Sequence, residues 1–121
     1  MYNDDSSSIS IDVKQVSEEL RIRPEIYLKI TISFVNSLSG KLKILSDAMS
    51  SNDRDQMRMT LHEIKGTAGN LRLRNLSAVE SVMHDAVKAG EPQSRLTSYF
   101  EALRQESEKL QQYMNTLTRN N

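Results

Sequence analysis

The chain of 121 residues contains no cysteine. This absence excludes disulfide bonds, thiolate metal sites and cysteine nucleophiles. Basic and acidic residues balance at 16 each, so no overall field attracts nucleic acid or an anionic membrane. No apolar run approaches the roughly 18–20 residues that span a bilayer, and the first residues lack the apolar stretch of a signal peptide. We therefore expect a cytoplasmic protein that neither binds nucleic acid nor inserts into a membrane.

Proline and glycine are also scarce, with two prolines and four glycines. No useful stretch alternates apolar and polar residues as a strand does. Apolar residues instead recur every three to four positions, which predicts amphipathic helices. A polar tail at residues 1–9 is predicted to be disordered, and one helical domain is predicted over residues 10–118. Its first helix is short and runs from Ser10 or Asp12 to about Arg21.

Four longer helices are predicted to follow, over residues 24–49, 53–72, 75–89 and 92–117. The first and last of them begin at a proline, which suits the first helical turn. The expected core stripe of the first long helix is Ile26, Ile30, Phe34, Leu38, Leu42, Leu45 and Met49, widened by Ile32, Val35 and Ile44. Long helices with short connections predict an all-α fold, an antiparallel up-down-up-down four-helix bundle. The short N-terminal helix is an accessory to it.

Residues 61–71 concentrate the unusual residue types of the chain. On a helix, His62, Lys65, Gly66 and Gly69 fall on one stripe. That stripe lies about 130° around the helix from the predicted core residues Met57, Leu61, Ile64, Ala68 and Leu71, so it faces water, together with Arg58.

The two glycines of this stripe each cost about 1 kcal/mol of helix stability relative to alanine. A partner whose backbone must come close to His62 explains them. Neutral drift, or a frayed and bent helix, is the alternative.

The chemistry of the stripe suits phosphoryl transfer. An exposed imidazole is nucleophilic near pH 7, and Lys65 can meet the added phosphoryl charge as a compact cation. Arg58 could add to the positive field. No glycine loop of a nucleotide-binding enzyme is present. The phosphoryl group must therefore come from another protein and leave to another protein.

The motif resembles the signature of histidine-containing phosphotransfer (HPt) domains, in the segment Leu61-His62-Glu63-Ile64-Lys65-Gly66-Thr67-Ala68-Gly69-Asn70-Leu71. The resemblance implies a four-helix bundle that carries phosphoryl groups between receiver-domain aspartates of response regulators and a hybrid sensor histidine kinase. It implies that His62 is the phosphoacceptor, that Lys65 stabilises the phosphoryl charge, and that Gly66 and Gly69 admit the receiver. It also implies a protein without kinase activity or cofactor of its own, with Mg²⁺ held by the receiver. We expect a monomer.

The family often has glycine after the Asn-Leu pair, where this chain has Arg72. We assign Arg72 and Leu73 to the partner-binding surface, at the point where this chain departs from the family pattern. Arg72 and Arg74 could select a partner as rim charges. Alternatively, they are solvated cations that favour the helix dipole.

Three other functions fit the sequence less well. A non-catalytic helical interaction module needs neither His62 nor Lys65. A histidine-kinase dimerisation fragment typically has proline at the fifth position after the histidine, where this chain has Thr67. A zinc site fails because Gly66 stands where the second histidine of the protease motif is required. His84 is interpreted as a solvated surface histidine. Whether the chain is free-standing or excised from a hybrid kinase stays open.

Overall fold

A computed structural model describes residues 11–119 of the chain. The predicted disordered tail at residues 1–9 lies outside the described residues. Within residues 11–119 all regular structure is helical, and no strand is present. The five helices are α1 (Val13–Leu20), α2 (Pro24–Ser50), α3 (Arg54–Asn70), α4 (Arg74–Lys88) and α5 (Gln93–Arg119). The predicted all-α fold is confirmed.

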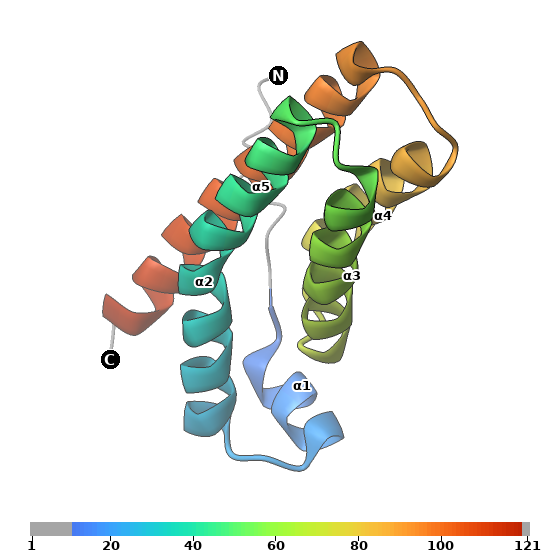
Figure 1. Cartoon of the computed structure of the whole chain (residues 1–121). Coiled ribbons are helices and arrows are strands. Elements are labelled where there is room, and N and C mark those ends of the chain that lie inside the picture. The colour runs from blue at the N-terminus through green and yellow to red at the C-terminus, as the bar shows by residue number, and fades with distance from the viewer. Residues whose placement is uncertain (1–10, 120–121) are drawn as a thin grey trace, which may run out of the picture.

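The four long helices form a bundle around one core (Figure 1). α2 packs against α3 and α5, and α4 packs against the same two helices. The short α1 packs against α2. None of the helices in the described part of the chain is both long and apolar enough to cross a bilayer.

The helix starts follow from local sequence. Asp12 caps α1 by accepting a hydrogen bond from the backbone N–H of Gln15 at 3.0 Å. Asp53 caps α3 in the same way, with the N–H of Gln56 at 3.1 Å. Pro24 occupies the first turn of α2, where its missing N–H leaves no gap in the hydrogen-bond ladder. These starts agree with the predicted ones.

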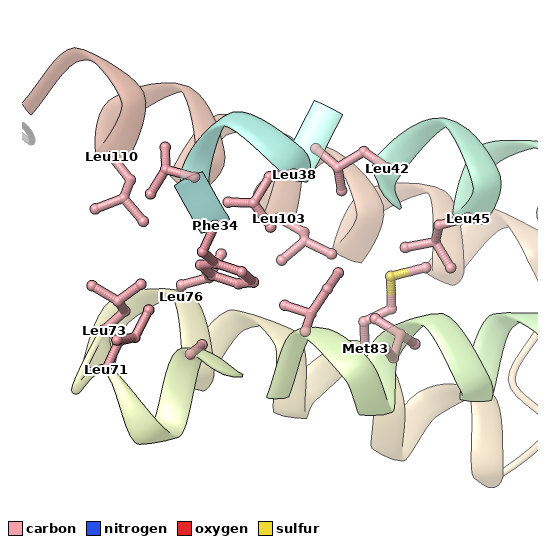
Figure 2. Close-up of a cluster of buried hydrophobic side chains, with 14 of the residues drawn as sticks. Phe34, Leu38, Leu42, Leu45, Leu71, Leu73, Leu76, Met83, Leu103 and Leu110 are labelled. Carbon is pink, nitrogen blue, oxygen red and sulfur yellow. The ribbon is translucent and has the colours of Figure 1, made fainter. Parts of the chain in front are cut away.

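The core lies between α2 and α5 on one side and α3 and α4 on the other (Figure 2). The predicted core stripe of α3 is confirmed, since all of its residues are buried: Met57, Leu61, Ile64, Ala68 and Leu71. Because these side chains hold α3 to the bundle, the opposite side of this helix is left to solvent.

The predicted core stripe of α2 is wrong at two positions and incomplete at two others. Ile30 is 45% exposed and Ile44 is 49% exposed. Tyr27 and Thr31 are buried in the first half of the helix. The Tyr27 hydroxyl donates a buried hydrogen bond to the backbone oxygen of Leu71 at 2.6 Å. This bond joins α2 to the end of α3 and satisfies the hydroxyl of the inward-facing Tyr27.

Candidate functional site

The exposed face of α3 carries the predicted stripe. His62, Lys65, Gly66 and Gly69 are all exposed, and so is Arg58. Arg58 forms an ion pair with Asp55 on the same helix. Among residues 11–119, no hydrogen bond or ion pair to His62 is found. The imidazole is therefore open to an incoming group.

The two glycines leave open space beside the histidine. A Cβ atom added at Gly66 or at Gly69 would meet no atom within 4 Å. Neither residue has positive φ, so neither is required by the backbone conformation. The packing of this bundle therefore does not account for the two glycines, and a larger side chain would fit at either position.

The α2 side of the stripe is bordered by an ion pair. Lys41 of α2 donates to the Glu63 carboxylate of α3 at 3.3 Å. Met59 on α3 is 58% exposed, and Ile44 on α2 is 49% exposed. This side of the stripe therefore combines a charge pair with exposed apolar side chains.

The α4 side of the stripe differs from the prediction. His84 is not a solvated surface histidine, because its side chain is only 15% exposed. Its Nδ1 lies 3.1 Å from Oε2 of Glu80, a carboxylate with no exposed surface. Burial raises the pKa of Glu80, and the hydrogen bond from His84 and the charges of His84 and Lys65 oppose this rise.

The sequence prediction missed Glu80 altogether. A signal for it was present, because Glu80 lies four residues after Leu76 and three before Met83, two core residues of α4. His84 follows four residues later, the spacing at which side chains meet on a helix. α4 packs against both α3 and α5, so it buries a wider arc than a single apolar stripe.

Arg72 has a structural role in the turn between α3 and α4. It has φ of 62°, in the left-handed region. The N–H of Arg72 bonds to Gly69 O at 3.1 Å and the N–H of Leu73 bonds to Ala68 O at 2.9 Å, as in a Schellman motif. Glycine is usual at this position, which explains the glycine of the family pattern in physical terms.

The left-handed backbone of Arg72 costs free energy, and the contacts of its side chain offset part of this cost. Its guanidinium donates to Asn70 O at 3.0 Å and to Gly69 O at 3.4 Å, at the end of α3. It also pairs with Glu19 of α1 at 3.2 Å. The group is thus engaged within the molecule rather than standing free as a rim charge.

Leu73 does not offer its side chain to a partner, since it is buried in the core at 4% exposure. A hollow of about 340 Å³ lies between α1, the α3–α4 turn and α5, and Arg72, Leu73 and Glu106 line it. His62 and Lys65 do not line this hollow. Arg72 and Leu73 therefore line a hollow in which His62 and Lys65 take no part.

The sequence also matches a known protein family. A family model described as "Hpt domain" matches residues 29–117. The chain belongs to the Hpt domain family. Searches of curated proteins and of solved structures found no match. Hpt domains are helical bundles that act by histidine phosphotransfer in two-component phosphorelays, where they interact with receiver domains and kinases.

The match includes the whole of α3 and α4 and leaves α1 outside it. The exposed stripe and the Glu80–His84 pair therefore lie in the Hpt domain. Across residues 11–119 of this Hpt domain protein, no three His, Asp or Glu side chains gather as a metal site would require.

Proposed function

We propose that His62 is the phosphoacceptor of a phosphorelay intermediate. The observation that carries this proposal is the exposed stripe of α3, where His62 stands beside Lys65 and two glycines whose Cβ positions are empty. We further propose that the four long helices run antiparallel in up-down-up-down order, and that the protein is a cytoplasmic monomer.

The proposed reaction is a displacement at phosphorus. Nε2 of His62 attacks the phosphoryl group of a receiver phosphoaspartate, the acyl O–P bond breaks, and the carboxylate leaves as an N–P bond forms. A second receiver aspartate then attacks phosphorus, and the imidazole leaves. The receiver would supply Mg²⁺, and the Hpt domain would supply a positioned nucleophile and a docking surface.

Each residue of the stripe has a role in this proposal. Lys65 stabilises the charge of about −2 that a phosphoryl group adds. Gly66 and Gly69 let the receiver approach His62, and Arg58 extends the positive field. Arg72 and Leu73 are left out of the docking surface, because the first is engaged within the molecule and the second is buried.

Transfer of phosphate from labelled receiver domains tests the proposal. Wild-type protein should gain an acid-labile, base-stable phosphoryl group, and peptide mapping should locate it at His62. His62→Gln should fold normally, because this side chain makes no contact with the core, and should carry no label. Continued labelling of His62→Gln, at His84 for example, would overturn the assignment. A wild-type protein that no receiver or cognate kinase labels would favour a non-catalytic interaction module.

A further inference from the structure

Glu80 is a carboxylate in a place where an apolar residue would be expected. It has no exposed surface and lies among the core residues of α4. Burial of a carboxylate costs free energy unless hydrogen bonds and opposite charges compensate for it. The compensating groups here are His84 at 3.1 Å and the Ser81 hydroxyl, which donates to Oε1 at 3.4 Å. The charge of Lys65 also acts on this carboxyl group and lowers its pKa, against the larger effect of burial.

The Glu80–His84 pair lies on α4, the helix that packs against α3 and its proposed phosphorylation site. Glu80 is buried in this packing, and the charge of Lys65 on α3 acts on its carboxyl group. α3 and α4 pack together and are joined by residues 71–73, so the chain reverses between them (Figure 1).

The chain reversal sets the two histidines at similar heights. His62 comes ten residues before Arg72, the middle residue of the connection, and His84 comes twelve residues after it. Since a helix rises about 1.5 Å per residue, the two histidines lie at nearly the same height along the two helices.

The pair also leaves one nitrogen of His84 available. When Glu80 is ionised its carboxylate only accepts hydrogen bonds, and its bond with His84 then requires a proton on Nδ1 of His84. Within the described part of the chain, Nε2 of His84 has no hydrogen-bond partner. The ring is thus held at one nitrogen, with the other free.

We propose that Glu80 is a positioning residue of the phosphotransfer site, which holds His84 so that Nε2 of His84 forms a hydrogen bond with the phosphoryl group on His62. The inference rests on the proposed role of His62. With a proton on each ring nitrogen, His84 has two N–H donors. Nδ1 then donates to Glu80 and Nε2 donates to a phosphoryl oxygen.

This arrangement lengthens the lifetime of phosphorylated His62. Hydrolysis passes through a metaphosphate-like transition state, in which the transferred group carries less negative charge than the ground state. A cationic donor that holds the phosphoryl oxygens stabilises the ground state more than this transition state. Loss of the donor should therefore speed hydrolysis.

Chemical phosphorylation tests the inference without any partner protein. Phosphoramidate transfers its phosphoryl group to the imidazole of His62: the P–N bond to the amino group breaks, a P–N bond to the ring forms, and ammonia leaves with the ring proton. The half-life of phosphorylated His62, located by peptide mapping, is then compared among wild type, Glu80→Gln, His84→Gln and the double variant. Lys88→Gln, which removes an exposed cation one turn beyond His84, is the matched control.

Glu80→Gln and His84→Gln should each shorten the half-life by about three- to tenfold, as expected for loss of one charge-assisted hydrogen bond. The double variant should match His84→Gln alone, because Glu80 acts through His84, and Lys88→Gln should match wild type. Unchanged half-lives, or a double variant in which the two effects multiply, would overturn the inference. A purely structural role would lower the melting temperature without changing the half-life.

The two proposals fail in different ways. If Glu80→Gln does not fold, His84→Gln provides the test, because the His84 side chain is partly exposed. An unchanged half-life of phosphorylated His62 in His84→Gln overturns the inference. If no receiver phosphorylates His62, the proposed function fails, whereas the phosphoramidate measurement still tests the Glu80–His84 pair.

Discussion

At the scale of single residues, the exposed side of α3 combines side chains that the bundle itself does not need. His62 and Lys65 are exposed, and the two glycines give up helix stability without relieving a clash at their Cβ positions. Each of these residues is therefore explained by a partner and not by folding. This separation allows variants to change transfer and stability independently.

Gly66→Leu and Gly69→Leu should each stabilise the free protein and slow transfer. Removal of a helical glycine favours the helix by about 1 kcal/mol, and the added Cβ atom meets no atom within 4 Å. The same side chain would stand where the receiver must approach, so the transfer rate should fall by about tenfold or more, corresponding to about 1.4 kcal/mol. Chemical denaturation and rapid-quench transfer assays measure the two effects.

Gly40→Leu is the matched control for the glycine variants. Gly40 is also an exposed helical glycine with empty space at its Cβ position, but it lies on α2. This variant should gain stability and keep its transfer rate. If the α3 variants transferred as fast as Gly40→Leu, the two glycines would have no role in docking.

Lys65→Ala should shorten the lifetime of phosphorylated His62 and slow its formation. The ammonium group lies within one turn of His62, where it offsets the phosphoryl charge. We expect an effect of about fivefold on the hydrolysis rate, as for one partly solvated ion pair of roughly 1 kcal/mol. Lys88→Ala, on the exposed side of α4, is the comparison. Equal lifetimes in the two variants would make Lys65 a bystander.

At the scale of helices, the turn between α3 and α4 is the point where several elements are joined. Tyr27 binds the turn to α2 through Leu71 O, and Arg72 binds it to α1 through Glu19. Arg72 also bonds to the carbonyl groups at the end of α3. The arginine therefore gives up favourable backbone geometry and gains contacts that glycine cannot make.

Replacement of Arg72 separates these two effects. Arg72→Ala loses the guanidinium contacts but keeps a Cβ atom at positive φ. Arg72→Gly loses the guanidinium contacts and also removes the Cβ atom that makes positive φ unfavourable. The glycine variant should be more stable than the alanine variant by about 1 kcal/mol, as expected for a left-handed position. Both should show faster amide hydrogen exchange in α1. Equal stability of the two variants, or unchanged exchange in α1, would contradict this interpretation.

At the scale of the whole molecule, the bundle has an apolar interior that also holds the carboxyl group of Glu80. Most of the core is aliphatic or methionine, and Glu80 is placed among these side chains. A buried ionisable pair is weak evidence for stability. The hydrogen bond of Glu80 with His84 and the effect of the Lys65 charge on it connect it instead to the exposed side of α3.

The stability of the protein should depend on pH through Glu80. Because burial raises the pKa of Glu80 in the folded protein, the native state binds more protons than the unfolded chain between the two pKa values. The stabilising contribution is therefore present below the ordinary carboxyl pKa and is lost as pH rises through the folded value. Glu80→Gln removes this titration, so its stability relative to wild type should increase with pH across that window. Parallel urea-unfolding profiles against pH would contradict this prediction.

By itself, the sequence determined the helices, the buried stripe of α3 and the exposed position of His62 beside Lys65, Gly66 and Gly69. These features follow from the spacing of residues along one helix, which backbone geometry sets locally. The resemblance to HPt domains was likewise contained in one contiguous segment, and the family match confirms it.

Only the tertiary structure decided which residues outside that segment matter. Three features depend on contact with a second helix. They are the burial of Glu80 with the partial burial of His84, the inward position of Tyr27, and the ion pair of Arg72 with Glu19. A helical wheel gives the direction of each side chain but not how many neighbours cover it. The sequence therefore located the proposed nucleophile, His62, whereas the packing of α4 against α3 determined that Glu80 is buried.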